Sequence, residues 1–193
     1  MKRILGTLIA LSILVTPVVA SASDWAIDAS HSTVGFKVRH FFTKVGGNFG
    51  EYSGTITYDP KHPEKASVEV TINAASINTN HEKRDGHLKS EDFFFVESHP
   101  EITFKSNKVE KKDDVLHVHG DLTMRGVTKP VVLKTEFLGA GPDGWGGTRA
   151  GFTATTKINR KDFGINWNKA LDQGGAVLGD DVAITLDIEA VLE

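Results

Sequence analysis

The amino-acid sequence predicts an all-β protein, an eight-stranded antiparallel barrel with one short helix and a long late loop. Apolar and polar residues alternate along most of the chain, so each strand has one dry and one solvated face, as in antiparallel sheets. About eight such segments occur between turns, enough to close a small barrel. The length of 193 residues suits one such domain.

The N-terminal segment is typical of a secretory signal peptide. Lys2 and Arg3 precede an apolar run that is broken by a proline, and Ala-Ser-Ala at 20–22 matches a small-residue cleavage site. An uncleaved membrane anchor is the competing interpretation, which the cleavage site and the proline disfavour. We therefore expect residues 1–22 to be removed, residues 23–193 to form the barrel domain, and the protein to be periplasmic. Cleavage leaves 171 residues and changes the net charge from −3 to −5, because both cations leave.

The predicted strands follow one another along the mature chain, and each shows the period-2 pattern. Their dry faces carry, in chain order, Val34, Phe36 and Val38; Ile56; Val68, Val70 and Ile72; Ile102 and Phe104; Leu116, Val118 and Leu122; Val131, Leu133 and Phe137; Phe152, Ala154 and Ile158; and Val182, Ile184, Leu186, Ile188 and Ala190. A tight turn is predicted at Arg125-Gly126, where glycine accepts a positive φ.

Two segments depart from this alternation. Thr79 and Glu82 have the spacing of a capping box, and helix formers follow to about Ser90, which predicts a short helix that Gly86 weakens. Residues 159–180 form a long glycine-containing stretch before the last strand. Stretches of this length are usually lids, binding loops or disordered segments.

The composition excludes several classes of function. With no cysteine, the chain has no disulfide, thiol nucleophile, zinc finger or iron–sulfur site. A net charge of −3 provides no broad basic field, so no nucleic-acid partner is expected. Neither a phosphate-binding glycine loop nor a serine nucleophile elbow is present. His117 and His119 share one strand face at a spacing found in metal sites, but that face is polar. We therefore expect no catalytic residue, no bound metal and no cofactor.

The predicted barrel interior is apolar, and alternation alone leaves open whether it is filled or hollow. His40 continues the inward register of its strand, and Phe41 follows it, so a ligand head group could meet His40. The alternative is a half-buried histidine satisfied by the backbone. Arg160 ends its strand in the same way and could bind a phosphate or carboxylate, although a surface arginine is the commoner outcome.

Aromatic residues gather in two later segments, Phe93-Phe94-Phe95 and the group Phe163, Ile165 and Trp167. Three consecutive phenylalanines cannot all face one way in a chain of this kind. Core packing and a lid over an apolar ligand are both consistent with this pattern.

Titratable residues are dense between positions 80 and 87. His81, Arg84 and Asp85 are neighbours at helical spacing, and His87 lies near Arg84. Ion pairs that hold the loop are the simplest interpretation. The alternative is a metal-dependent enzyme that uses these residues together with His31 or His40.

Several motifs, in order and at the expected spacings over residues 24–192, resemble the YceI-like family of secreted, lipocalin-like barrels. They include Asp28-x-x-His31-Ser32-x-Val34-x-Phe36-x-Val38-x-His40, Asn80-His81-x-x-Arg84-Asp85-x-His87-Leu88, Gly120-Asp121-Leu122-Thr123-x-x-Gly126-Val127-Thr128, and Arg160-Lys161-Asp162-Phe163-Gly164-Ile165. Each motif is weak alone, and together they are strong.

The resemblance implies a periplasmic barrel whose apolar interior binds a polyisoprenoid or another long amphiphile. The residues it places in the cavity are Val34, Phe36, Val38, Ile56, Phe104 and Phe152. The residues assigned to the mouth or lid are His31, His40, Phe41, Arg84, Asp85, His87, Phe94, Phe163 and Trp167.

The leading hypothesis is thus a carrier, store or scavenger of an isoprenoid-type lipid such as a prenyl phosphate or a quinone. Transient membrane contact and a homodimer formed through an exposed strand edge are compatible with it. Two alternatives remain, the metal-dependent enzyme described above and a stress-related or interaction protein with a solid barrel.

Overall fold

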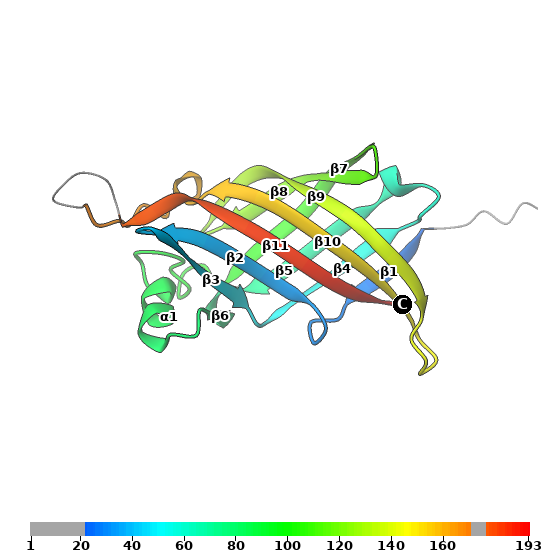
Figure 1. The fold of residues 1–193 in the computed structure, drawn as a ribbon, viewed down its shortest axis with the longest axis horizontal. Helices are drawn as coiled ribbons and strands as arrows, with labels where there is room; N and C mark the ends of the chain where they lie inside the picture. Colours follow the sequence, from blue (N-terminus) through cyan, green and yellow to red (C-terminus); the bar gives the residue numbers. More distant parts are fainter. Residues whose placement is uncertain (1–21, 171–176) are drawn as a thin grey trace, which may run out of the picture.

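The computed structural model describes residues 22–170 and 177–193, and it shows an elongated antiparallel barrel (Figure 1). The predicted signal peptide lies outside the described residues, except for Ala22. The strands are β1 (Ser23–Ile27), β2 (Thr33–His40), β3 (Thr43–Phe49), β4 (Tyr52–Tyr58), β5 (Ser67–Asn73), β6 (Ile77–Asn78), β7 (Glu101–Lys112), β8 (Val115–Met124), β9 (Val127–Pro142), β10 (Thr148–Asn159) and β11 (Leu178–Leu192). The helices are α1 (Glu82–Lys89) and the 3-10 turns η1 (Pro63–Lys65), η2 (Ala74–Ser76) and η3 (Arg160–Phe163).

Eight strands close into a ring in the order β1-β4-β5-β7-β8-β9-β10-β11, because β1 pairs with both β4 and β11. Trp25 lies opposite Ile56 on one side and Leu192 on the other. Closure satisfies the backbone donors and acceptors on both sides of a strand. The predicted eight-stranded antiparallel barrel is confirmed.

Three further strands extend the sheet from β11 as a leaf, β2-β3-β6. β2 pairs with the first half of β11, where Val34 faces Leu186, whereas β1 pairs with its last residues. The sequence did not predict β1, β3 or β6. β1 has five residues, β6 has two, and β3 contains a Gly-Gly pair that interrupts the alternation.

The turn between β8 and β9 lies at Arg125-Gly126 as predicted. Both residues have positive φ, 52° for Arg125 and 72° for Gly126. This is the backbone of a tight two-residue hairpin, whose twist matches that of the flanking strands.

Helix α1 is present, but its cap differs from the prediction. His81 is the N-cap, and its Nδ1 accepts from the Arg84 N–H at 3.3 Å. Thr79 lies before the helix and is buried. Asn80, with a φ of 58°, turns the chain between them, and the Thr79 hydroxyl bonds to the side chains of Arg84 and Asp85 rather than to a backbone N–H of the first turn. Across residues 22–170 and 177–193, no helix is both long enough and apolar enough to cross a membrane.

The apolar core has two parts. The first surrounds Trp25, Tyr58 and Phe152, where β1 closes the ring. The second surrounds Phe93 and Phe163, near α1 and the leaf. The two parts occupy opposite ends of the barrel (Figure 1).

Candidate ligand cavity

The barrel encloses a cavity of about 600 Å³ whose walls are almost entirely aliphatic and aromatic. The predicted cavity residues all line it, namely Val34, Phe36, Val38, Ile56, Phe104 and Phe152. On β2 they alternate with the exposed Thr33, Lys37 and Arg39. The period-2 pattern thus distinguishes the residues that line the cavity from those at the protein surface. The interior is hollow rather than filled by side chains.

Aromatic rings form the inner end of the cavity. Tyr58 and Phe152 line it, and Phe137 packs against both, with ring centroids 4.8 Å from Tyr58 and 5.3 Å from Phe152. Burial, and to a smaller extent the nearby Asp59, raise the pKa of the Tyr58 hydroxyl, so the cavity wall formed by these rings stays uncharged.

The opposite end, the mouth, is lined by polar and basic side chains. His40 comes from the end of β2, and His81, Lys83, Arg84 and His87 come from α1 and its N-cap. A cavity that is apolar at one end and basic at the other suits a long chain with an anionic or polar head.

The residues before α1 hold Arg84 in place at the mouth. Its Nε donates to Thr79 Oγ1 at 2.7 Å and its Nη2 to the Thr79 carbonyl at 2.8 Å. Asp85 accepts from the Thr79 N–H at 2.9 Å and from the Thr79 hydroxyl. Burial opposes ionisation of Asp85, but these hydrogen bonds outweigh it and lower its pKa. Asp85 does not line the cavity. It stabilises the mouth indirectly, by holding Thr79, which in turn binds Arg84.

His87 belongs to an aromatic cluster beside the mouth. Its ring lies 5.0 Å from Phe93 and 5.0 Å from Trp167, and its Nε2 lies 2.7 Å from Asp92 Oδ2. Trp167 and Phe94 also line the cavity, as expected of mouth residues. Phe163 does not. It is 1% exposed and packs in the second part of the core, with Phe93 and Ile165.

Arg160 is buried rather than on the surface, and its guanidinium is occupied. Nη1 donates to the carbonyls of Ile165 at 2.7 Å and Trp167 at 2.8 Å, Nε to that of Gly179 at 2.9 Å, and Nη2 to Asp180. Burial lowers its pKa. This residue lines the cavity and supports the segment that carries Trp167, and four of its five N–H donors are held by these carbonyls and by Asp180.

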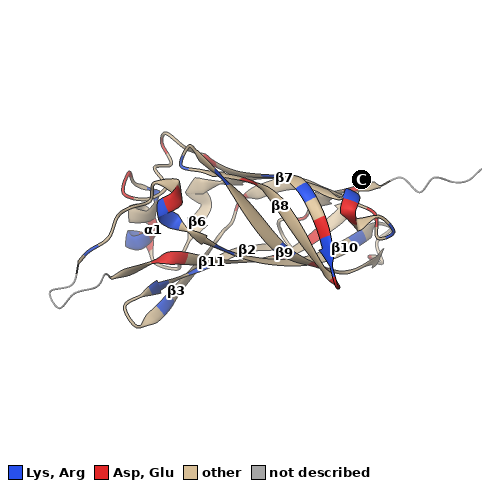
Figure 2. Ribbon diagram, turned by 90° about the horizontal axis from the view of Figure 1, so that it is seen from above, with Lys and Arg blue, Asp and Glu red and all other residues tan. Residues whose placement is uncertain are grey.

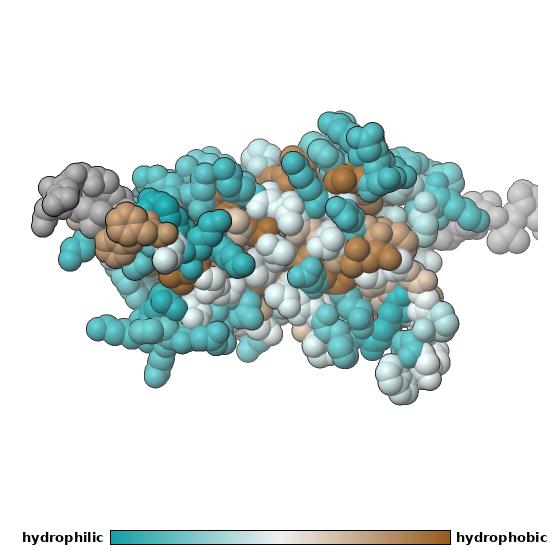
Figure 3. All heavy atoms as spheres, in the orientation of Figure 1, coloured by the Kyte–Doolittle hydropathy of each residue, from teal (hydrophilic) through white to brown (hydrophobic). Residues whose placement is uncertain are grey.

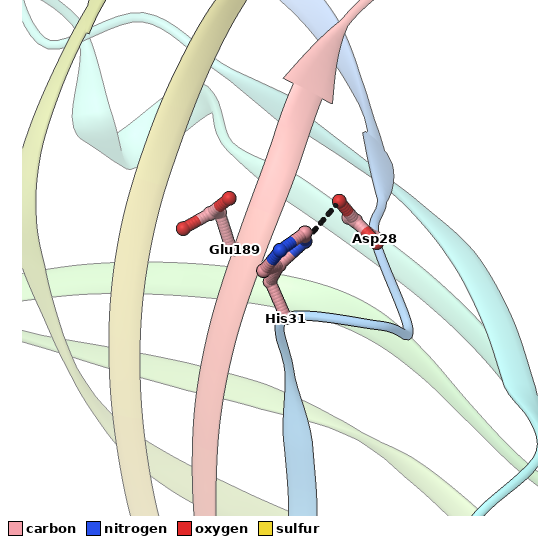
Figure 4. A group of neighbouring side chains, drawn as sticks. All are labelled: Asp28, His31 and Glu189. Carbon is pink, nitrogen blue, oxygen red and sulfur yellow. Dashed lines mark hydrogen bonds and ion pairs between the residues drawn. The ribbon is translucent and has the colours of Figure 1, made fainter. Parts of the chain in front are cut away.

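His31 lies away from the mouth, in the β1–β2 turn. Its Nδ1 is 2.8 Å from Asp28 Oδ2, and Glu189 projects from β11 nearby (Figure 4). Asp28, His31 and Glu189 are the one group within the described ranges with three metal-ligating atoms close together. Arg149 Nη1, however, donates to Asp28 and to Glu189, at 2.6 Å each.

The guanidinium of Arg149 therefore occupies the position that a cation would take. Its hydrogen bond lowers the pKa of Asp28 well below the usual range, with smaller contributions from Ser30 and His31. The arrangement is an ion-pair network joining β1, β10 and β11.

The structure does not bring His31 to residues 81–87. His40, the other histidine that the metal-dependent hypothesis offers, lines the mouth with His81 and His87, but within the described ranges these histidines form no group of three close ligand atoms.

Phe41 also does not line the cavity. It is 40% exposed at the tip of the β2–β3 hairpin, where its ring packs edge-on against that of His40. Two residues at the ends of the cavity were not predicted as site residues, Lys83 and Tyr58. Tyr58 continues the inward register of Ile56, and Lys83 lies four residues before His87 on α1, so parity and helical spacing could have indicated both.

Known proteins share both the sequence and this architecture. The sequence model of the YceI-like domain matches residues 25–190. The Protein YceI of Escherichia coli O157:H7 is 41% identical over 194 residues, covering 99% of this chain and 98% of that protein. The chain belongs to the YceI-like family.

Solved structures agree with this membership at the level of the fold. The crystal structure of BcnA from Burkholderia cenocepacia superposes with a TM-score of 0.76 at 21% identity, covering 85% of this chain and 99% of that one. A polyisoprenoid binding domain from Saccharophagus degradans superposes with a TM-score of 0.65 at 16% identity, covering 89% and 99% of the two chains. The YceI-like barrel is thus common to proteins of widely different sequence.

Proposed function

We propose that this YceI-like protein binds one long apolar amphiphile of the polyisoprenoid class, with its tail in the barrel and its head group at the mouth. The observation that carries this proposal is the cavity of about 600 Å³, apolar along its walls and basic at one end. Each CH₂ group moved from water into such walls contributes roughly 0.8 kcal/mol, so a long tail supplies most of the affinity. The Saccharophagus degradans domain, described as polyisoprenoid binding, supports the ligand class.

At the mouth, Lys83 and Arg84 supply the charge for an anionic head. Lys83 is exposed and has no ion-pair partner among the described residues. Arg84 also lines the cavity. Its Nε and Nη2 donate to Thr79, and its Nη1 has no hydrogen-bond partner among the described residues, so Nη1 is free to donate to a ligand. A phosphate is the head group that such a pair of cations recognises best.

Ligand binding is tested by native mass spectrometry of protein purified without detergent, before and after addition of a long-chain polyprenyl phosphate. We expect a one-to-one complex. Ala154→Phe places a ring in the cavity, which Ala154 lines, and should abolish the complex, whereas Ala183→Phe on the exposed face of β11 should retain it. Detection of only the free mass in the unsubstituted protein would overturn the proposal.

We further propose that the protein works in the periplasm as a carrier or store of this lipid rather than as an enzyme. The predicted signal peptide at 1–22 supports this location. Intact mass of the protein from a periplasmic extract should correspond to residues 23–193. A mass of the full chain, or absence from that extract, would contradict it.

A further inference from the structure

The β2–β3 hairpin ends in two phenylalanines at the molecular surface. His40 pairs with Thr43, so Phe41 and Phe42 alone make the turn. Phe42 is 100% exposed and Phe41 40% exposed. Figure 3 shows hydrophobic atoms at the surface on this end of the molecule. Adjacent exposed aromatic residues of this kind mark an interaction surface rather than a packing requirement.

The backbone of this turn favours other residues. Phe41 has a φ of 50°, in the left-handed region that bulky side chains seldom occupy. Two-residue hairpin turns favour glycine, asparagine or aspartate at such positions. The conformation is nevertheless well held, since the Phe41 N–H donates to the Val177 carbonyl at 2.8 Å and Arg39 Nη1 donates to the Phe41 carbonyl at 2.9 Å. The hairpin therefore carries two phenylalanines at its tip although the backbone of this turn favours glycine, asparagine or aspartate.

The hairpin is also basic, although the chain as a whole is acidic. No acidic residue occurs between Asp28 and Glu51, whereas Lys37, Arg39 and Lys44 lie along β2 and β3. Within the described part of the chain, none of these three cations forms an ion pair. Figure 2 shows the resulting basic colouring of the hairpin. Aromatic rings flanked by lysine and arginine are complementary to the surface of an anionic membrane.

The same hairpin contributes to the cavity. His40 and Val45 line the cavity on either side of the Phe41-Phe42 tip, and the His40 ring lies 4.8 Å from that of Phe41. The tip and α1 lie at the same end of the barrel (Figure 1). A surface that contacts the tip would therefore lie close to the mouth.

We propose that the Phe41-Phe42 tip inserts into the surface of an anionic phospholipid bilayer, with Lys37, Arg39 and Lys44 against the lipid head groups. This docking brings the mouth to the bilayer, so that an apolar ligand can pass between them without crossing water. The transfer of a ligand between bilayer and cavity rests on the proposed function, whereas the docking to the bilayer does not. A second copy of the chain that docked symmetrically through this hairpin is a poorer partner, because a hairpin with three cations and no acidic residue would face another of the same charge.

Co-sedimentation of the mature chain with vesicles tests the docking. We expect binding to vesicles of phosphatidylglycerol and phosphatidylethanolamine, weak binding to pure phosphatidylcholine, and weakening by about 0.5 M salt. Phe42→Ser should lower vesicle affinity about tenfold, because one inserted ring is lost, and it should not affect folding, because that ring is fully exposed. Lys44→Glu should also lower it about tenfold by reversing one charge at the surface.

Matched controls come from other loops. Trp145→Ser removes an aromatic residue that is 89% exposed in the β9–β10 connection, and Lys111→Glu reverses an exposed charge on β7. Both variants should bind vesicles like the unsubstituted protein. The docking proposal would be overturned if Phe42→Ser and Trp145→Ser lost vesicle affinity equally, or if the unsubstituted protein did not bind vesicles. The proposal would also be overturned if sedimentation velocity showed a dimer that Phe42→Ser dissociates, and if the protein did not bind vesicles.

The docking and the ligand proposal fail in distinguishable ways. The ligand can be supplied from detergent micelles, which bypasses the bilayer, and its uptake followed by native mass spectrometry. If the protein sediments with vesicles but takes up no polyprenyl phosphate from micelles, the proposed function fails and the docking stands. If it takes up the lipid from micelles but does not sediment with vesicles, the docking alone fails.

Discussion

The two ends of the barrel are made of the same alternating strands and close in different ways. At the inner end, β1 pairs with β4 and β11, and the rings of Tyr58, Phe137 and Phe152 fill the space between them. At the mouth, β11 pairs with β2 instead, and α1 with the segment after Arg160 covers the opening. Apolar packing is present at both ends, but β1 pairing closes the inner end, whereas side-chain hydrogen bonds to the main chain hold the segments at the mouth.

This difference explains where polar groups are found. Backbone pairing satisfies the main chain at the inner end, so apolar rings suffice there. At the mouth the chain leaves the ring, and its carbonyls need donors such as Arg160 and Arg84. The position where regular pairing ends is therefore also where charged groups can meet a ligand. Substitutions at the two ends should separate these contributions.

The largest effect is expected at the mouth, from Arg160→Met. This change leaves the carbonyls of Ile165, Trp167 and Gly179 without their donor, while Asp180 keeps its ion pair with Lys161, and it should lower the free energy of unfolding by about 4 kcal/mol. Urea denaturation measures it. Lys134→Met, on the exposed face of β9 and without an ion pair among the described residues, is the control. If both variants lose the same small amount, the mouth does not depend on this guanidinium.

At the inner end, Phe152→Ala should lower the free energy of unfolding by about 3 kcal/mol, because the ring packs against Tyr58 and Phe137. It should also lengthen the cavity, so that native mass spectrometry detects longer isoprenoids in the complex. Phe42→Ala, a fully exposed ring, should leave unfolding unchanged. If Phe152→Ala lowered the free energy of unfolding no more than Phe42→Ala does, ring packing would not stabilise this end of the barrel.

The ion-pair network at the inner end predicts a pH dependence. Arg149 holds the pKa of Asp28 below its usual range, so the carboxylate stabilises the fold above the unfolded pKa of about 4 and less as pH falls below it. Asp28→Asn should therefore cost about 1–2 kcal/mol at neutral pH, with a difference from the unsubstituted protein that narrows below about pH 4.

Thermal unfolding from pH 3 to 8 measures this difference. Asp114→Asn, in the exposed β7–β8 turn, should show no such narrowing. A gap between Asp28→Asn and the unsubstituted protein that stays constant through acid pH would contradict the network's electrostatic role.

The smallest effect concerns the head group. Lys83→Met should weaken binding of a polyprenyl phosphate about threefold and leave binding of the uncharged polyprenol unchanged, because only the phosphate meets the cation. Lys89→Met lies on the same helix and outside the cavity lining, so it should change neither. Equal losses for both ligands would assign Lys83 a packing role instead.

Local patterns predicted much of the fold. Parity along β2 and β10 identified which residues face inward, and the Arg125-Gly126 turn followed from glycine chemistry. The weak elements were not predictable, since β3 contains a Gly-Gly pair and β6 has only two residues. The cap of α1 was assigned to Thr79, because spacing does not reveal that the Thr79 hydroxyl bonds to the side chains of Arg84 and Asp85 and leaves the backbone N–H of Arg84 to His81.

The candidate site was predictable only in part. The six wall residues follow from period 2, but the mouth is assembled from β2, α1 and the segment near Trp167, which are far apart in sequence. Local pattern therefore could not indicate that Arg160 would be enclosed by carbonyls, that Phe163 would turn into the core, or that His31 would lie beside Arg149.

The sequence by itself determined the antiparallel all-β class, the inward and outward faces of the strands, and the family, because each depends on residue order along the chain. Only the tertiary structure decided that the interior is a cavity of about 600 Å³ with one aromatic and one basic end. The alternation of apolar and polar residues predicts which side chains point into the barrel. Whether inward side chains meet depends on how wide the closed ring is and on which distant strands bring large rings together, and that is a property of the assembled barrel.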